Sequence, residues 1–298
     1  MNLGDIKKAL LDGGVVGAGG AGFPTYAKLS DQAETIILNA AECEPFITSD
    51  HRLMLEDAED LIAGCQLVMQ FLGLSEGFIG IEDNKMDAIQ HLDQLLAAKG
   101  ITNIKTFKLQ ARYPKGAERV LVYEVTGKTM NAGVLPADLG IILSNVTTLA
   151  FVGQYFRTGM PLVTKRMTVD GDAVARPTNV IAPIGTQIHD VIEFCGGYKK
   201  EPRKIIMGGP MMGFALFDLN VPTTKTASAL LCLTKDEVAA NAETACIRCG
   251  RCVDVCPGHV VPQMMMAAAE RHDLAMFEKL NGMECCECGS CTFICPAH

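Results

Sequence analysis

The 298-residue sequence contains no tryptophan, and aromatic residues make up only 6% of it. It has no run of about 18 apolar residues free of charges and breakers, so we expect no transmembrane helix. The first residues, MNLGDIKKALLDGG, include Asp5 and lack the long apolar stretch of a secretory signal peptide. The net charge of −8 disfavours nucleic acid as the main partner. These absences favour a protein of the cytoplasm.

Cysteine, by contrast, is abundant, with 13 residues. Without an export signal, a disulfide framework is not expected. Two runs, CIRCGRCVDVC at 246–256 and CCECGSCTFIC at 285–295, repeat the spacing C-x2-C-x2-C-x3-C, and each precedes a proline. Four single cysteines are expected to be mostly buried as small hydrophobic residues: Cys43, Cys65, Cys195 and Cys232.

The doubled run is typical of two-cluster ferredoxins, in which three ligands of each [4Fe–4S] cluster come from one run and the fourth comes from the other. One cluster is expected on Cys246, Cys249, Cys252 and Cys295, and the second on Cys285, Cys288, Cys291 and Cys256. Zinc is the alternative, but zinc sites usually combine two C-x2-C pairs. The segment between the runs, 264–280, is expected to form one helix with Met264–Met266 in core packing.

A glycine-rich segment, GVVGAGGAGFPTYAKL at 14–29, contains G-x-G-x-x-G at Gly17, Gly19 and Gly22. A dinucleotide-binding loop should follow a strand, whereas the residues upstream are predicted to form a helix that ends in two glycines. The segment is therefore predicted to be a phosphate cradle of another kind, with Lys28 as an added charge. A purely structural turn is the alternative.

Strand patterns at 34–45, 75–83 and 139–150 alternate with helical segments such as 51–72, which predicts an α/β domain with a mainly parallel sheet. Ligands of such sheets bind at the carboxyl ends of the strands. The polar side chains and glycines expected at these ends or in the adjoining loop are Asn39, Glu42, Glu44, Tyr113, Gly116, Glu118, Asn145, Thr147 and Thr148.

Four segments, GAGGAGFPTYAKL, NAAECEP, YPKGAER and NVTTLA, resemble in this order the flavin- and NADH-binding segments of the complex I 51-kDa protein. They resemble more closely the C subunit of the Rnf electron-transport complex and the cobalamin reductase of propanediol-utilisation microcompartments. Residues 167–197 resemble the small β-grasp (SLBB) domain of those proteins. The resemblance implies a Rossmann-like parallel-sheet flavin domain at 1–162, an SLBB domain at 163–228 and a helical two-cluster ferredoxin-like domain at 229–298.

The resemblance also implies non-covalent FMN, with NADH as substrate. The positions that match the family's flavin and nucleotide contacts are Gly17, Gly19, Gly20, Gly22, Phe23, Lys28, Asn39, Glu42, Glu44, Gly116, Glu118, Asn145 and Thr148, of which Phe23 and Glu44 stand where the family contacts NADH. The sequence departs from complex I at Ala41, where complex I has an acid, and at Ala117, where it has the first of two glutamates.

The expected function is electron transfer from NADH through FMN to the two clusters and on to an acceptor. The early glycine loop and the end at CPAH favour the microcompartment type, continuing beyond His298, with cobalamin or an adenosyltransferase as acceptor. ITSDHRLM, GIEDNKMDAI and GVLPADLGI favour the Rnf type, attached peripherally to a membrane complex, with ferredoxin or other Rnf subunits as partners.

Two further alternatives remain. The chain could be a relay or scaffold protein without flavin. It could also bind a corrinoid through its β-grasp domain with His189 or His259 as cobalt ligand, although a surface or core role is the simpler interpretation of these histidines.

Overall fold

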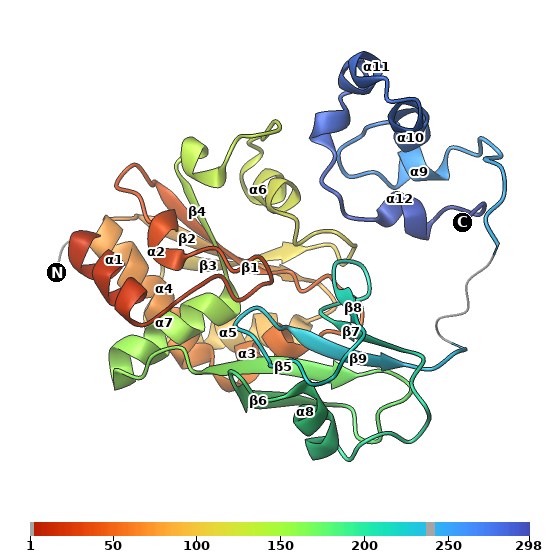
Figure 1. The fold of residues 1–298 in the computed structure, drawn as a ribbon. Helices are drawn as coiled ribbons and strands as arrows, with labels where there is room; N and C mark the ends of the chain where they lie inside the picture. The colour runs from red at the N-terminus through yellow and green to blue at the C-terminus, as the bar shows by residue number, and fades with distance from the viewer. Residues whose placement is uncertain (1–2, 237–241) are drawn as a thin grey trace.

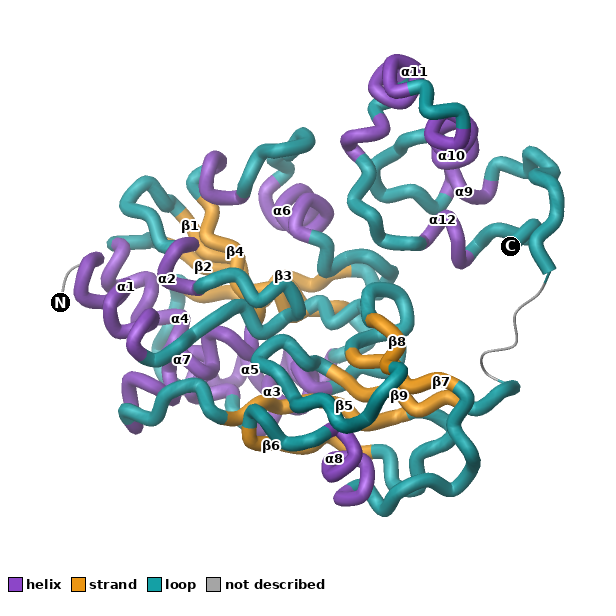
Figure 2. The backbone as a smooth tube through the Cα atoms, in the orientation of Figure 1, coloured by secondary structure: helices purple, strands orange, loops and turns teal. Residues whose placement is uncertain are grey.

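The computed structural model describes residues 3–236 and 242–298 and contains three parts, which we call the N-terminal, middle and C-terminal domains (Figures 1 and 2). The N-terminal domain holds a four-stranded parallel sheet in the order β3-β2-β1-β4. Its strands are β1 (Thr35–Ala40), β2 (Glu76–Glu82), β3 (Ile104–Leu109) and β4 (Ile141–Asn145). The predicted α/β class is confirmed. Because the chain moves outward from β1 to β3 and then returns to the other side of β1, a topological switch point lies between β1 and β4.

Helices cover both faces of this sheet, as Figure 1 shows. One face carries α1 (Leu3–Asp12), α3 (Ser49–Glu56), α4 (Ala58–Leu72), α5 (Met86–Ala98) and α7 (Val146–Thr158), and the other carries α6 (Glu118–Thr126) and the short helix η1 (Pro136–Leu139). Along β1, Ile36 and Leu38 pack into the first cluster and Ile37 packs into the second. Because both faces of the strand are buried, its sequence is a nearly continuous apolar run.

The glycine-rich loop lies between α1 and α2 (Thr25–Lys28), so no strand runs into it. This confirms that it is not an ordinary Rossmann loop. The helix predicted over 51–72 is interrupted: α3 ends before Asp57, whose φ and ψ of −119° and 26° are not helical, and α4 begins at Ala58.

The middle domain is a mixed five-stranded sheet in the order β6-β5-β9-β7-β8, packed against α8 (Ile188–Phe194). Its strands are β5 (Thr164–Asp170), β6 (Thr178–Pro183), β7 (Lys204–Met207), β8 (Phe214–Leu216) and β9 (Ala229–Leu233). Strand β9 pairs with both β5 and β7. The predicted boundary at residue 228 therefore separates β9 from its own sheet, and the middle domain continues to Leu233.

The single cysteines behave largely as expected. Cys65 is buried in the N-terminal domain, and Cys195 and Cys232 are buried in the middle domain. Cys43 is the exception, because it is only partly buried, and its Sγ accepts a hydrogen bond from the Gly116 N–H at 3.2 Å.

The C-terminal domain consists of short helices: α9 (Arg251–Asp254), α10 (Pro262–Glu270), α11 (Leu274–Lys279), η2 (Gly282–Glu284) and α12 (Ser290–Phe293). The prediction of a single helix over 264–280 is wrong, because His272 adopts a left-handed φ of 54°. Asp273 then caps a new helix, since its side chain accepts a hydrogen bond from the Met276 N–H at 3.0 Å. Of the three methionines expected in core packing, Met265 is buried, but Met264 and Met266 are half-exposed. No helix of the described residues is long and apolar enough to span a membrane.

Helices α4 and α7 cross at two glycines. A Cβ atom added to Gly64 would lie 1.9 Å from the Leu149 carbonyl oxygen, and one added to Gly153 would lie 2.1 Å from the Asp60 carbonyl oxygen. Only glycine allows this approach. The crossing fixes α7, whose first turn lies at the switch point.

We predict that Gly64→Ala destabilises the N-terminal domain by about 1–3 kcal/mol, because the helices must separate to admit the methyl group. The exposed Gln70→Ala on the same helix is the control and should change stability by less than about 0.5 kcal/mol. Thermal unfolding followed by circular dichroism measures both; equal melting temperatures for the two variants would contradict the close crossing.

Candidate functional site

The switch point brings two asparagines together. Asn39 on β1 and Asn145 on β4 are partners in the strand register. The Asn39 side chain donates to the Gly116 carbonyl at 2.8 Å and accepts from the Ala41 N–H at 3.2 Å. Asn145 caps α7 by accepting from the Thr147 N–H at 2.9 Å. The ends of β1 and β4 are thus tied to the segment before α6 and to the start of α7.

The glycine-rich loop lies over Asn145. The Gly17 N–H donates to the Phe23 carbonyl at 2.8 Å and closes the loop, and a Cβ on Gly19 would lie 3.2 Å from the Asn145 side chain. Gly20 has a φ of 124° and no atom within 4 Å of an added Cβ, so this part of the loop is open. In the described residues, the N–H groups of Gly19, Gly20 and Ala21 donate no hydrogen bond. Three backbone donors are therefore free at an open surface.

The Lys28 side chain lies beside this loop and contacts residues of three other segments. Its ammonium donates to the Leu143 carbonyl at 3.2 Å, lies 3.8 Å from the Glu118 carboxylate and 5.9 Å from the centre of the Phe23 ring. Thr148 reaches the same loop by accepting from the Ala18 N–H at 2.9 Å. Free N–H donors, an open glycine and a nearby lysine are what a phosphate group requires, so the loop fits the phosphate of FMN.

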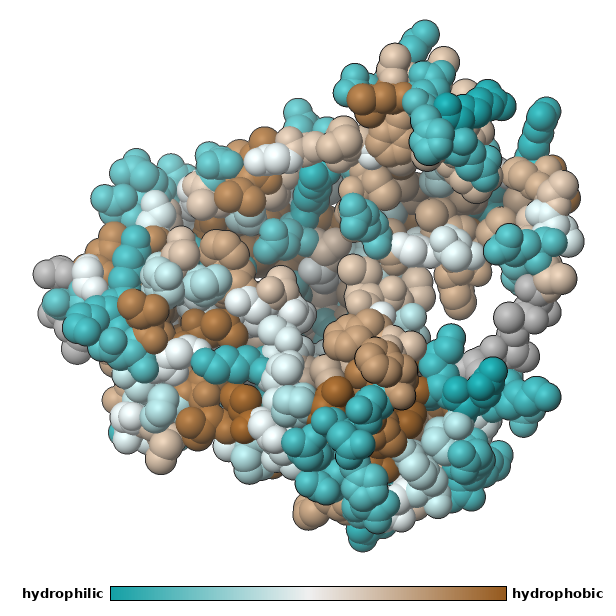
Figure 3. Space-filling view, viewed as in Figure 1, coloured by the Kyte–Doolittle hydropathy of each residue, from teal (hydrophilic) through white to brown (hydrophobic). Residues whose placement is uncertain are grey.

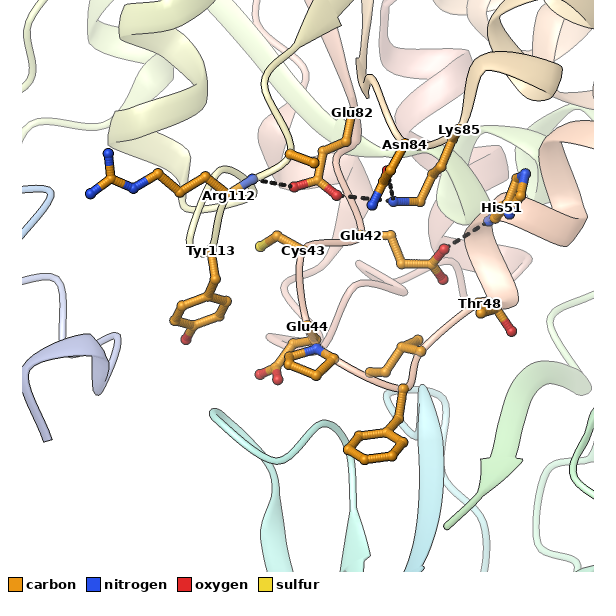
Figure 4. A pocket seen from close by; sticks show the side chains of 14 residues that line it. Glu42, Cys43, Glu44, Thr48, His51, Glu82, Asn84, Lys85, Arg112 and Tyr113 are labelled. Carbon is orange, nitrogen blue, oxygen red and sulfur yellow. Dashed lines mark hydrogen bonds and ion pairs between the residues drawn. The ribbon is translucent and has the colours of Figure 1, made fainter. Parts of the chain in front are cut away.

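A cavity of about 390 Å³ lies at the carboxyl ends of β1, β2 and β3 (Figure 4). Lys85 is buried there, and its ammonium donates to the Glu82 carboxylate at 2.9 Å and to the Ala41 carbonyl at 3.2 Å. His51 and Tyr113 line it as well. The sequence analysis did not assign Glu82 or Lys85 to a site. Glu82 is the last residue of β2 and Lys85 lies three residues beyond it, so the preference of ligands for the carboxyl ends of parallel strands would have selected both.

Glu42 lines this cavity rather than the glycine loop. Its carboxylate accepts from the N–H groups of Asp50 and His51 at 2.6 and 2.9 Å and so caps α3. Asp50 in turn accepts from the side chains of Asn145 and Thr147 at 2.7 and 2.6 Å, which links the cavity to the switch point. Burial and the neighbouring Asp50 charge raise the pKa of Glu42 to about 8.

Glu44 also lines the cavity, but it lies against the middle domain. One carboxylate oxygen accepts from the Met211 N–H at 3.1 Å, whereas the other, Oε1, is buried and has no hydrogen-bond partner in the described residues. Burial raises the pKa of this carboxyl group. A buried acceptor without a donor is costly, so Glu44 is suited to a ligand that brings an N–H group.

The two cysteine runs have the same backbone geometry. Arg248 and Glu287 both adopt a φ of 55°, and their N–H groups donate to Cys246 Sγ and Cys285 Sγ, both at 3.4 Å. Gly250 and Gly289 follow with φ of 82° and 76°. Curled loops with N–H groups directed at sulfur are suited to hold a cluster.

The beginning of each run lies beside the end of the other. The Thr244 N–H donates to the Ala297 carbonyl at 2.9 Å, and a Cβ on Gly258 would lie 3.0 Å from the Glu284 carbonyl oxygen. This arrangement fits the exchange of the fourth ligands, Cys295 and Cys256. Among the described residues, no three His, Cys, Asp or Glu side chains are close enough together to hold a single metal ion. A cubane cluster does not require this, because it binds each thiolate to a separate iron. The ligand set itself stays a prediction.

The C-terminal domain contacts the N-terminal domain through the segment around its second run. The Tyr113 hydroxyl donates to the Cys288 carbonyl at 2.7 Å, and Arg119 pairs with Glu284 at 2.9 Å. Glu284 also accepts from the Ala132 N–H. In the part of the chain that the structure describes, the hydrogen bonds between these two domains all reach Glu284 or Cys288. The space-filling view shows a recess between the C-terminal domain and the rest of the molecule (Figure 3).

Comparison with known proteins agrees with this geometry. Residues 10–154 match the Nuo51 FMN-binding domain, residues 166–215 match the SLBB domain and residues 239–296 match the 4Fe-4S dicluster domain. The expected cofactor classes, FMN and iron–sulfur clusters, are thereby supported. The three matches follow one another along the chain in the order that the resemblance implies.

The curated relatives that the chain matches are C subunits of ion-translocating oxidoreductase complexes. The chain is 42% identical over 283 residues to the C subunit of the Na(+)-translocating ferredoxin:NAD(+) oxidoreductase complex of Acetobacterium woodii, covering 94% of this chain and 63% of the relative. It is 43% identical over 273 residues to the C subunit of the proton-translocating complex of Clostridium ljungdahlii, covering 90% and 58%. Over at least 90% of its own length the chain is thus homologous to C subunits of Rnf-type complexes. It spans less than two thirds of the length of these relatives.

Solved structures support the same fold. Two structures of an NAD+-reducing [NiFe]-hydrogenase match with TM-scores of 0.65, in the air-oxidized state, and 0.68, in the H2-reduced state. The identities are 22% and 18%; the matches cover 78% and 98% of this chain and 47% and 60% of the matched chains. The curated relatives support the Rnf-type alternative better than the expected cobalamin reductase, and neither cobalamin nor a microcompartment finds support among them.

The raised pKa of Glu42 predicts a pH dependence of stability. The folded state favours the protonated carboxyl group of Glu42. The stability that this preference contributes is complete below a pH of about 4.5 and is lost as the pH rises through about 8. The side chain in Glu42→Gln is neutral at every pH. The melting temperature of this variant should therefore rise relative to that of the wild type as the pH is raised from about 5 to about 9. The exposed Glu34→Gln is the control. A constant difference across this range would contradict the assignment.

Proposed function

We propose that this chain is the flavin and iron–sulfur module of an Rnf-type ferredoxin:NAD(+) oxidoreductase and exchanges electrons between NADH and two [4Fe–4S] clusters. The observation that carries the proposal is the docking of the second cysteine run, at Cys288, on Tyr113, in the loop that leads to Gly116 and Glu118. This contact brings a cluster loop beside the predicted flavin site. The relatives named above are parts of such oxidoreductases, which supports the same function.

Each group of residues has a role in this proposal. The free N–H groups of Gly19–Ala21 and Lys28 would hold the FMN phosphate, and Asn39, Asn145 and Glu118 would line its polar edge. When bound, FMN supplies the exchange between a two-electron hydride donor and one-electron clusters. The cavity beside Glu44 would take the nicotinamide, whose carboxamide N–H can satisfy the buried Oε1. Phe23 is half-exposed and offers a ring face to the nucleotide.

The docking also predicts an order for the clusters. The second run, with Cys285, Cys288 and Cys291, lies against the N-terminal domain, whereas the hydrogen bonds described between the domains do not involve the first run. The cluster of the second run is therefore proposed to be the nearer one to the flavin. The cluster of the first run would face the downstream partner, for which ferredoxin or another protein of the complex is the proposed candidate.

Cysteine variants test this order. In Cys249→Ser, NADH should still reduce the flavin and the cluster of the second run. In Cys288→Ser, the flavin should be reduced, but the remaining cluster should stay largely oxidised. Stopped-flow absorption and electron paramagnetic resonance of the anaerobic protein measure both, with dithionite as the control for an intact cluster. Rapid reduction by NADH of the first-run cluster in Cys288→Ser would contradict the order.

Docking can be weakened without touching a cluster ligand. Glu284→Ala removes the pairing with Arg119 and the acceptor for Ala132, so we predict that cluster reduction slows by roughly fivefold to tenfold, since partly exposed charge-assisted hydrogen bonds contribute about 1–1.5 kcal/mol. Flavin reduction by NADH should be unchanged. Glu278→Ala, exposed on α11 of the same domain, is the matched control. Equal rates in both variants would show that this contact does not govern transfer.

A further inference from the structure

A lysine of the middle domain reaches the glycine-rich loop of the N-terminal domain. Lys165 lies on β5, and its ammonium donates to the Ala18 carbonyl at 2.7 Å. Lys165 is only 4% exposed. Ala18 is also held through its other polar group, because its N–H donates to Thr148 Oγ1 at 2.9 Å. Both polar groups of Ala18 are therefore fixed by side chains from outside the loop.

The strand that carries Lys165 is firmly attached to the N-terminal domain. Arg166, the next residue, pairs with Glu56 at 2.6 Å and with Asp57 at 2.7 Å. Two residues further on, Thr168 Oγ1 accepts from the Thr48 N–H at 3.0 Å. These contacts along β5 hold the ammonium of Lys165 in place beneath the loop.

Keeping a cation at this position is costly. Burial lowers the pKa of Lys165 to about 8, and the attraction of Asp50 acts in the opposite direction. In the described residues, the ammonium makes one hydrogen bond, with the Ala18 carbonyl, although it can donate three. A neutral apolar side chain would fill the same space at lower cost. The charge therefore requires an explanation beyond packing, and an anion at the adjoining loop supplies one.

We propose that Lys165 is a positioning residue for the phosphate of FMN. It holds the Ala18 carbonyl so that the N–H groups of Gly19, Gly20 and Ala21 remain free and directed to one anion, and it adds a buried positive charge to the cradle. The inference rests on the proposed function, because it takes FMN as the ligand of the loop. It assigns to the middle domain a part in cofactor binding that the motifs of the N-terminal domain alone do not contain.

The test compares two ligands that differ only in the phosphate. FMN and riboflavin are titrated into flavin-free protein, and binding is followed by flavin fluorescence. In Lys165→Met, the dissociation constant of FMN should rise by about tenfold or more and that of riboflavin by less than about twofold. The reason is that the buried charge and the positioned N–H groups act on the phosphate, which riboflavin lacks. Lys165→Arg, which keeps the charge and the donors, should recover part of the affinity for FMN.

Two further variants complete the design. Thr148→Val keeps the shape of the side chain but removes the other anchor of Ala18, so it should show the same selective loss of FMN affinity even where Lys165→Met folds poorly. Lys128→Met is the control, since this lysine also donates to a backbone carbonyl, that of Leu139 at 3.0 Å, while neither this bond nor its ion pair with Glu34 involves the glycine-rich loop. It should bind FMN like the wild type.

The outcomes separate the inference from the proposed function. Equal losses of FMN and riboflavin affinity in Lys165→Met and Thr148→Val, or unchanged FMN affinity in both, would overturn the role of Lys165. A wild-type protein that binds neither flavin would overturn the proposed function, and the inference with it.

Discussion

The parallel pairing of β1 with β4 is the constraint on which the site depends. It places Asn39 opposite Asn145 and leaves a switch point at which two polar strand ends meet. The glycine-rich loop, the segment before α6 and the first turn of α7 all converge there through hydrogen bonds to these asparagines or to their neighbours. The close crossing of α4 and α7 at Gly64 and Gly153 then holds α7 against the sheet. A ligand site at this edge follows from topology rather than from any single motif.

Much of this arrangement could be read from the sequence. Strands with both faces buried are continuous apolar runs, and the polar residues at the ends of β1 and β4 mark the edge of the sheet at which the ligand site is proposed. The repeated cysteine spacing predicts the cluster domain for an equally local reason. The two runs have matching backbone angles at Arg248 and Glu287, so the repeat in sequence is also a repeat in structure.

Other features depend on distant parts of the chain and could not be predicted from local patterns. Lys165 is an ordinary lysine in a strand until the middle domain is packed against Ala18. Glu44 matches a family position, but its contact with Met211 and its unpaired oxygen depend on how the two domains meet. The break at His272 could not be seen because good helix formers surround it, and a left-handed residue followed by the capping Asp273 outweighs their propensity.

The central claim is that one chain holds a flavin and two clusters in electronic contact. The most direct measurement is an anaerobic NADH titration of the protein reconstituted with iron, sulfide and FMN and then desalted, recorded by visible absorption. The account predicts that about one FMN and about eight irons remain bound and that NADH bleaches the flavin bands and then the cluster bands. Retention of the irons without flavin and without any response to NADH would contradict it, and the chain would then be an electron relay that receives its electrons from another protein.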